Sequence, residues 1–282
     1  MAYGSGNGHY GVHRPRWGQK GSKWTPTDIS GNVLWLSAGY GCYSDDGGTT
    51  PSGDGDVIAF LRDRSGNGYD ATQTNNTKRP ILKTNIQNGE PVMRFDGIDD
   101  VLIVPRMEGK FSAGFTWFVV AKVDDGHPSA TKVFWGSMDA QDYPPNIYQY
   151  FNIMLVTNGK IKIGVRSGEV IKTRYPHTLG DGASDFFIID ARADPADKFG
   201  AYYNGSSSDT PIDITSLNWD NIAGENTERI AIGARWRDGA VEDNYYFDGD
   251  IAELIIYGRP LSDSERSKVR NYLAEKYDIT IN

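Results

Sequence analysis

The most regular pattern of hydrophobic and polar residues lies in the last forty residues of the chain. A run of β-branched and aromatic residues at 251–257 predicts a buried strand, which Gly258 and Pro260 end. Ser262 and Glu265 have the spacing of a capping box, so a helix is expected to begin there. Residues at helical spacing then predict one buried stripe on that helix, made of Val269, Tyr272, Leu273, Lys276 and Tyr277.

Short runs of β-forming residues, separated by turn residues, fill the middle of the chain. The run at 115–122 is rich in aromatic and β-branched residues, and Asn158-Gly159 is a strong signal for a two-residue hairpin turn. Similar runs predict strands at 33–36, 132–135, 150–156, 160–166, 169–173, 185–191, 199–203 and 229–234. Many short strands with almost no helix predict an all-β protein, an antiparallel two-sheet jelly-roll sandwich with one short C-terminal helix and an irregular N-terminal arm.

Four segments, in the same order, carry a resemblance to a known family. They are Leu-Trp-Leu-Ser-Ala at 34–38, the loop 61–73 with Arg-Pro at 79–80, the Phe-Asp-Gly segment at 88–100, and Ile-Ala-Glu-Leu-Ile-Ile-Tyr at 251–257 followed by Leu-Ser-Asp-Ser-Glu-Arg. Together they resemble LamG-like domains of the concanavalin A-like lectin/glucanase superfamily, over about residues 32 to 278. The resemblance implies a jelly-roll fold. It does not imply one function, because this fold hosts lectins, adhesins, enzymes and virion proteins.

The N-terminal segment differs from the remainder in charge, so we divide the chain into an arm at 1–31 and a sandwich domain at 32–282. Residues 1–24 contain four basic residues and no acidic one, whereas the remainder holds 25 basic against 37 acidic residues. A glycine-rich segment of this kind cannot build a core of its own. It is either a disordered tail or an arm that docks on a partner, and the candidate docking residues are Arg14, Arg16, Trp17, Lys20 and Trp24.

Charge and composition exclude several classes of partner. A net charge of −8 argues against nucleic acid as the main partner. A single cysteine, Cys42, excludes an intrachain disulfide and a thiolate metal cluster. No run approaches the roughly 18 apolar residues of a membrane span, and the N-terminus has no signal-peptide core. We therefore expect a protein made in the cytoplasm and displayed on a virion surface, with an extracellular location as the alternative.

One acidic loop is a candidate cation site. Residues 43–56 carry four aspartates among glycines, and Ca²⁺ prefers several carboxylate and carbonyl oxygens from a flexible loop. The candidate ligands are Asp45, Asp46, Asp54 and Asp56. The loop lacks EF-hand spacing because no glutamate closes it, so we favour a solvated loop and expect no required cofactor. Asp96, Asp99 and Asp100 are interpreted first as turn residues and only second as metal ligands.

Two segments, 142–150 and 235–246, combine aromatic residues with carboxylates and amides and are expected to be loops. Rings of this kind stack on sugar faces while polar groups bind hydroxyls, and the same residues also form protein contacts. A third interpretation is that the rings pack the loops onto the sheets. The candidate ligand-binding residues are Tyr143, Tyr148, Tyr150, Trp236, Asp238, Asp243 and Tyr245.

The sequence offers no catalytic pattern. The glucanase branch of the family that the chain resembles uses two carboxylates in an E-x-D-x-E arrangement, but no glutamate here has an aspartate two residues after it. His9, His13, His127 and His177 lack the spacing of metal ligands. We therefore expect a protein that binds rather than catalyses.

These observations lead to one hypothesis and two alternatives. The hypothesis is a phage virion component, either a head decoration protein or a tail adhesin, which its arm attaches to other virion or surface proteins. The first alternative is a carbohydrate-binding, lectin-like module for host or environmental polysaccharide. The second is an enzyme acting on glycosides. The sequence leaves open whether the chain forms a homo-oligomer.

Overall fold

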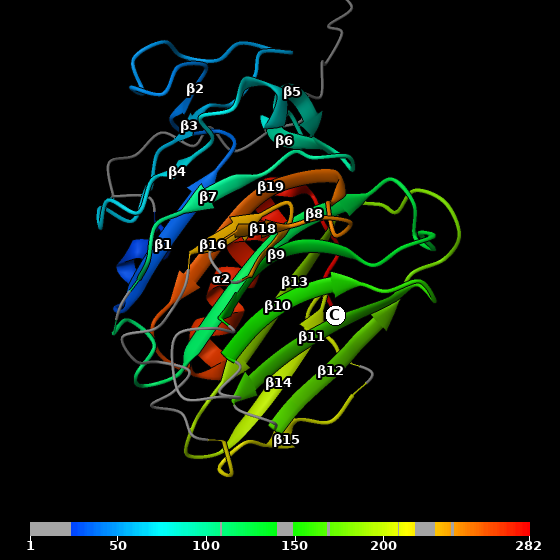
Figure 1. Cartoon of the computed structure of the whole chain (residues 1–282). Helices are drawn as coiled ribbons and strands as arrows, with labels where there is room; N and C mark the ends of the chain where they lie inside the picture. The colour runs from blue at the N-terminus through cyan, green and yellow to red at the C-terminus, as the bar shows by residue number, and fades with distance from the viewer. Residues whose placement is uncertain are drawn as a thin grey trace, which may run out of the picture.

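Two β-sheets lie face to face in the computed structural model, and one α-helix lies outside them (Figure 1). The structure describes residues 24–107, 109–139, 149–167, 170–207, 209–217, 229–237 and 240–282. All strand pairs among them are antiparallel except that β17 runs parallel to β9. The predicted all-β sandwich with a C-terminal helix is thus confirmed. In the described part of the chain, no helix has the length and apolar character needed to cross a membrane.

The first sheet is built around the strand that contains the apolar-rich run at 251–257. Its order is β15 (Ile212–Asp213), β14 (Lys198–Tyr203), β13 (Phe187–Ala193), β8 (Phe115–Val123), β19 (Asp248–Tyr257), β6 (Glu90–Asp96) and β5 (Ile81–Gln87). In addition, β1 (Asn32–Ser37) pairs with β19. Because β19 lies inside this sheet and is covered on both faces, all but its first residue are buried.

The second sheet holds most of the predicted middle strands. Its order is β12 (Val170–Thr178), β11 (Lys160–Ser167), β10 (Gln149–Leu155), β9 (Lys132–Asp139), β16 (Ile230–Ile232), β7 (Leu102–Val104), β4 (Ala71–Thr72), β3 (Phe60–Leu61) and β2 (Cys42–Tyr43). A hairpin of β17 (Arg235–Arg237) and β18 (Ala240–Glu242) adds to it through β9. Two short 3₁₀ helices are also present: η1 (Pro26–Asp28) precedes β1, and η2 (Asn76–Lys78) lies between β4 and β5.

Aromatic rings from both sheets meet in the core between them. The indoles of Trp117 on β8 and Trp135 on β9 contact edge to face, with 5.4 Å between their ring centres. Phe134 on β9 lies 4.5 Å from Phe247, which precedes β19. Burying rings of this size contributes the largest share of apolar area per residue, so these contacts fix how the sheets pack.

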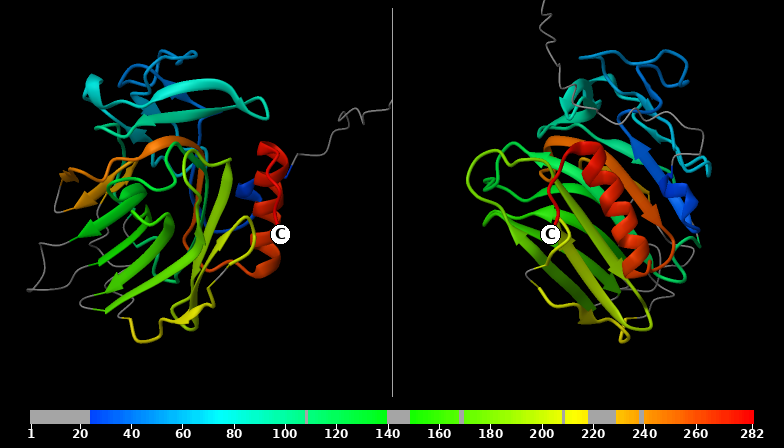
Figure 2. Two further views of the ribbon diagram at one scale, coloured as in Figure 1. Left: turned by 90° about the vertical axis from the view of Figure 1, so that its right-hand side faces the viewer. Right: turned by 180° about the vertical axis from the view of Figure 1, so that it is seen from behind.

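Helix α2 (Asp263–Tyr277) covers the outer side of the first sheet (Figure 2). The predicted capping box is present: Ser262 Oγ accepts from the N–H of Glu265 at 3.3 Å, and Glu265 accepts from the N–H of Ser262 at 2.9 Å. Val269, Leu273 and Tyr277 are buried against the sheet, as the predicted stripe requires. The helix also buries a charged residue that the pattern did not predict, Arg266.

Two buried acidic residues of the sheet hold this helix by polar contacts. Arg266 Nη2 donates to Asp190 Oδ2 on β13 at 2.6 Å. Glu253 on β19 accepts from Lys276 Nζ at 2.7 Å and from the Tyr277 hydroxyl at 2.7 Å. Since every one of these donors belongs to α2, the helix is attached to the sheet by charged as well as apolar contacts.

The described end of the predicted arm lies against the domain. Trp24 packs edge to face on Tyr272 of α2, with 5.8 Å between ring centres. The Tyr257 hydroxyl donates to the carbonyl of Pro26 at 2.8 Å, and Ile29 is buried beside the same apolar cluster. Residues 24–31 therefore pack on strand β19 and helix α2, and Trp24 contacts its own domain.

Candidate functional site

A polar hollow of about 530 Å³ lies at the end of the sandwich, where the turn between β6 and β7 meets the segment after β18. We call it the rim pocket; its lining residues are Lys78, Gly97, Ile98, Asp99, Ala130, Lys132, Asp243, Asn244 and Tyr246. Four separate segments of the chain contribute these residues. One of the residues predicted to bind ligand, Asp243, is among them.

The turn at one side of the rim pocket is shaped by its own aspartates. Asp96 Oδ1 accepts from the N–H of Ile98 at 2.9 Å, and Asp100 Oδ2 accepts from the N–H of Asp96 at 3.1 Å. Gly97 has a φ of 73°, and a Cβ there would lie 2.8 Å from the Cβ of Asp248. The turn therefore requires glycine at this position, and it presents Ile98 with 72% of its surface exposed.

The opposite side of the rim pocket is anchored by Tyr246. Its hydroxyl donates to Asp243 Oδ1 at 3.0 Å, and its ring is 5% exposed. The ring belongs to an apolar cluster on the outer side of the second sheet, formed with Val101, Ala231, Ala234 and Trp236. Because Tyr246 is held at both ends, Asp243 has a fixed position at the mouth of the pocket while its second carboxylate oxygen stays exposed.

Charges of both signs face the rim pocket. Asp99 and Asp243 contribute carboxylates, and Lys78 and Lys132 contribute ammonium groups. Lys132 Nζ donates to the carbonyl of Gly97 at 3.3 Å, which ties the start of β9 to the turn. Such a set can donate to and accept from a polar ligand, while the exposed Ile98 side chain offers an apolar contact.

Two carboxyl groups at or beside this turn have raised pKa values. Burial, with a smaller effect from Asp96, raises the pKa of Asp100 to about 7. Burial, followed by the charge of Asp124, also raises the pKa of Asp248 above its ordinary value. Burial at this end of the sandwich therefore favours the protonated form of both carboxyl groups, and neighbouring carboxylates act in the same direction.

Among the residues that the structure describes, one group of three carboxylates could hold a metal ion. Asp96, Asp99 and Asp100 each place a carboxylate oxygen within 4.8 Å of the others. Asp96 and Asp100 use oxygens to bond the backbone of the turn, as expected of turn residues. The group is thus first a structural one.

The four aspartates predicted as calcium ligands are not part of such a group. Asp45 accepts from the N–H groups of the segment 49–50, and the bond from Thr50 is the main cause that lowers its pKa to about 2. Asp46 pairs with Arg79. Asp54 and Asp56 accept backbone N–H groups at 2.8 and 2.7 Å, respectively. Each carboxylate has a partner in the protein, inside the loop for Asp45 and Asp56 and outside it for Asp46 and Asp54, and calcium binding by them stays a prediction.

The aromatic segment 235–246 was expected to be a loop, but it contains the hairpin of β17 and β18, because its residues pair with each other and with β9. Trp236 is only 9% exposed and lies in the same cluster as Tyr246. Tyr245 is half-buried, and the guanidinium of Arg235 lies 3.9 Å from its ring centre. Both rings therefore pack with the protein itself.

Several candidate residues fall beyond what the structure places. Tyr150 lies in β10, but its side chain is not described. The remaining predicted ligand and docking residues lie outside the described residues; they are Tyr143, Tyr148, Asp238, Arg14, Arg16, Trp17 and Lys20. Conversely, the sequence analysis did not identify Lys78, Ile98 and Lys132. Only Ile98 carries a signal, since an isoleucine flanked by Asp-Gly and two aspartates in a turn is expected to be exposed.

The comparisons with known proteins concern the fold. No protein-family model matches the chain, and no curated protein matches its sequence. Among solved structures, the binding domain of Paraclostridial Mosquitocidal Protein 1 is similar at 14% identity, with a TM-score of 0.59 over 88% of this chain and 53% of that one. The receptor binding domain of botulinum neurotoxin D has 12% identity and a TM-score of 0.56, over 88% of this chain and 54% of that one.

A sialidase of Trypanosoma rangeli is also similar, at 14% identity and a TM-score of 0.54, over 90% of this chain and 34% of the enzyme. The chain therefore spans about half the length of the toxin binding domains and about a third of the sialidase. At these identities the likeness concerns the fold alone. The LamG-like family stays a prediction, and the chain has an antiparallel two-sheet jelly-roll sandwich similar in fold to these binding domains.

Proposed function

We propose that the chain is a non-catalytic, LamG-like surface domain that binds polysaccharide through the rim pocket. The observation that carries this proposal is the composition of the pocket, in which two carboxylates, two ammonium groups and an amide surround an isoleucine that is 72% exposed. A sugar hydroxyl both donates and accepts, so it suits a pocket with both kinds of partner, and the aliphatic side chain suits the apolar face of a pyranose ring.

The similar structures support a binding role. Two of them are described as binding domains, and a third, the binding domain of botulinum neurotoxin DC, is in complex with SialylT at 13% identity and a TM-score of 0.53. The sialidase is an enzyme, but the similar part is 34% of it. We therefore favour binding over catalysis for this chain.

The rim pocket is tested by two substitutions that spare the fold. Ile98→Ser removes an exposed apolar contact, and Asp243→Asn keeps an oxygen for the Tyr246 hydroxyl while it removes the charge. On a glycan array, each is expected to weaken binding of the glycans that the unsubstituted protein selects by about tenfold, which corresponds to about 1.4 kcal/mol. Surface plasmon resonance with the selected glycans gives the affinities.

The matched control is Val170→Ser, because Val170 is an exposed aliphatic residue on β12 with no place in the rim pocket. If this variant loses as much affinity as Ile98→Ser, or if the folded protein binds no glycan on the array, the proposal is wrong. Repeating the array with EDTA tests calcium at Asp45, Asp46, Asp54 and Asp56, since a lost signal would require a bound cation.

A second proposal concerns attachment. The segment 1–24 is basic, whereas the remainder of the chain carries an excess of acidic residues. We propose that this arm attaches the domain to an acidic surface of a phage particle, as a head decoration protein or a tail adhesin. Trp24, the last residue of this segment, packs on Tyr272 of α2, so the segment joins the domain beside this helix.

Deleting residues 1–23 tests the arm, since the described domain begins at Trp24. We expect an unchanged thermal unfolding midpoint, unchanged glycan affinity, and loss of co-sedimentation with phage particles. A variant that retains the arm but replaces Arg14 and Arg16 with glutamine should show a partial loss that is largest at low salt, because salt screens the charges that the substitution removes. Retained co-sedimentation after the deletion would refute an attaching role.

A further inference from the structure

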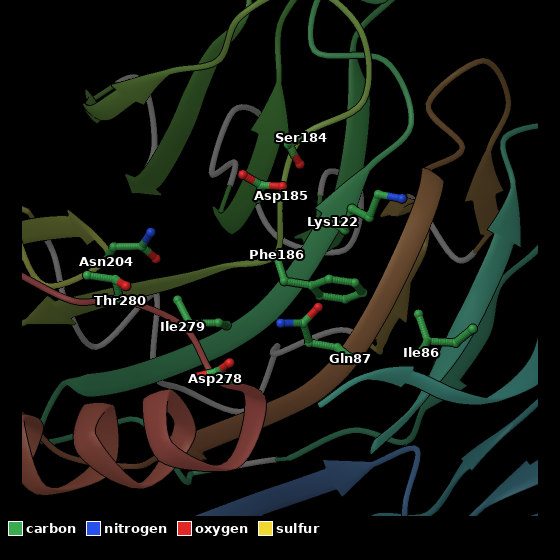
Figure 3. A pocket seen from close by; sticks show the side chains of 10 residues that line it. All are labelled: Ile86, Gln87, Lys122, Ser184, Asp185, Phe186, Asn204, Asp278, Ile279 and Thr280. Atoms are coloured by element: carbon green, nitrogen blue, oxygen red, sulfur yellow. The ribbon is translucent and has the colours of Figure 1, made fainter. Parts of the chain in front are cut away.

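A second hollow, of about 550 Å³, lies where helix α2 ends (Figure 3). We call it the helix-end pocket. It is bounded by the turn of the β5–β6 hairpin, the end of β8, residues 184–186 before β13, the turn after β14, and the tail that follows α2. The helix ends at Asp278, which has a φ of 50°, so the tail turns away from the helix axis and leaves space over the sheet.

The floor of the helix-end pocket is apolar. The ring of Phe186 lies in its centre, between Gln87 and Lys122 (Figure 3). Ile279 lies beside it, and Ile86 is 37% exposed at one side. A pocket with an aromatic floor and polar walls is the usual arrangement around a sugar ring or another amphipathic ring.

Two amide side chains in the walls have one hydrogen-bonding group committed to the fold. Gln87 Nε2 donates to the carbonyl of Tyr277 at 2.6 Å, and Asn204 Oδ1 accepts from the N–H of Ile188 at 2.8 Å. These bonds fix the orientation of both amides. Gln87 is left with its amide oxygen as an acceptor and Asn204 with its amide nitrogen as a donor.

The remaining polar side chains of this pocket have unused capacity. Within the described residues, Asp185, Asp278 and Thr280 make no side-chain hydrogen bond or ion pair, and all three are exposed. Lys122 is half-buried and lies 3.8 Å from Asp124, outside the pocket lining. Two carboxylates against one ammonium group disfavour an anionic ligand and favour a neutral, hydroxyl-rich one.

A third, smaller hollow of about 140 Å³ lies between the ends of β8 and β10 and the starts of β9 and β19. It shares Lys132 with the rim pocket. Its other end is at Val123, the residue after Lys122, and Val123 exchanges two hydrogen bonds of 3.0 and 2.9 Å with Ser184 of the helix-end pocket. The three hollows therefore follow one another around the same end of the sandwich.

We propose that one extended, uncharged polysaccharide chain lies along these hollows, with the helix-end pocket as a second sugar subsite. This inference rests on the proposed function, which it extends from one sugar to a chain. Aspartates outnumber lysines along the path, so acidic sugars such as uronates or sialic acids are disfavoured. The residues are Asp99, Asp243, Asp125, Asp248, Asp185 and Asp278 against Lys78, Lys132 and Lys122.

The test measures how affinity depends on the length of the oligosaccharide and how a substitution in the helix-end pocket changes that dependence. Isothermal titration of the full chain uses di- and hexasaccharides of the cello, malto, laminari and chito series. We expect a hexasaccharide of one series to bind about tenfold more tightly than its disaccharide. The double variant Asp278→Asn, Thr280→Val is expected to reduce hexasaccharide affinity to the disaccharide level and to leave disaccharide affinity unchanged. Asparagine also adopts positive φ, so the helix end is kept.

The matched control is Glu275→Gln, which removes an exposed carboxylate of the same helix outside the pocket. If the double variant binds the hexasaccharide like this control, while Ile98→Ser still weakens it, the second subsite is refuted and the rim pocket stands. If no series binds, both proposals are wrong. If hexagalacturonate binds more tightly than every neutral hexasaccharide, the uncharged class is wrong.

Discussion

Replacing Asp190 with alanine is expected to lower the free energy of unfolding by about 3–5 kcal/mol, because the buried guanidinium of Arg266 then keeps as its ion-pair partner only the exposed carboxylate of Asp263, whose Oδ1 lies 3.2 Å from Nη1. Asp190 is 0% exposed on β13, and Arg266 of α2 is 2% exposed with its Nη2 at 2.6 Å. The guanidinium also lies 3.9 Å from the ring centre of Tyr202. Without the carboxylate, this charge stays enclosed between helix and sheet. Urea unfolding followed by tryptophan fluorescence measures the loss.

The control for this prediction is an exposed pair of the same chemistry. Lys198 and Asp197 lie 4.0 Å apart with more than half of each side chain exposed, so Asp197→Ala is expected to cost less than about 1 kcal/mol. The double variant Asp190→Ala, Arg266→Met should recover part of the stability, since it removes both buried charges. A cost below about 1 kcal/mol for Asp190→Ala would mean that water reaches Arg266.

This ion pair also matters for the proposed binding path. Helix α2 is held to the first sheet by Arg266, Lys276 and Tyr277, and the same helix ends at the helix-end pocket. A variant with a loosened helix would lose long-chain binding for a structural reason. The substitutions chosen to test the second subsite, at Asp278 and Thr280, avoid these three residues, so loss of binding and loss of stability can be separated.

The helix was predictable because its signals are local. The capping pair Ser262 and Glu265 and the stripe Val269, Leu273 and Tyr277 lie within 15 residues of one another, and the structure places them as expected. Strand ends were less predictable, because the partner strand sets them. For example, β12 continues to Thr178, past Pro176, because β11 offers pairing partners along that length.

The rim pocket could be predicted only in part. Asp243 was identified from its neighbours in sequence, but Lys78, Ile98 and Lys132 reach the same hollow from other segments. The sequence could not indicate which rings would be exposed either. Trp236 was expected at a binding surface, yet the apolar cluster with Val101 and Tyr246 encloses it. The pairing of β17 with β9 places Trp236 in this cluster, and the local sequence pattern does not predict that pairing.

The protein is expected to lose stability as pH rises from about 4 to about 7, in part through Asp100. Burial raises the pKa of this carboxyl from 3.8 to about 7 in the folded state. Between about pH 4 and about pH 7 the unfolded chain releases the proton of this carboxyl while the folded chain keeps it. The bound proton therefore stabilises the folded state below about pH 4, and this stabilisation is lost as the pH rises to about 7. One such group contributes at most about 1.4 kcal/mol per pH unit.

Asp100→Asn separates this effect from that of other acidic groups. The pKa of Asp248 is also raised, so this group makes the free energy of unfolding fall with pH in the same direction. The informative quantity is therefore the difference in free energy of unfolding between the variant and the unsubstituted protein, measured by urea unfolding at each pH. Asparagine keeps an oxygen for the N–H of Asp96 but has no charge to bury. The variant should therefore show a shallower slope and, above pH 7, a higher free energy of unfolding than the unsubstituted protein. Parallel curves for the two proteins would contradict a raised pKa of the buried Asp100 carboxyl.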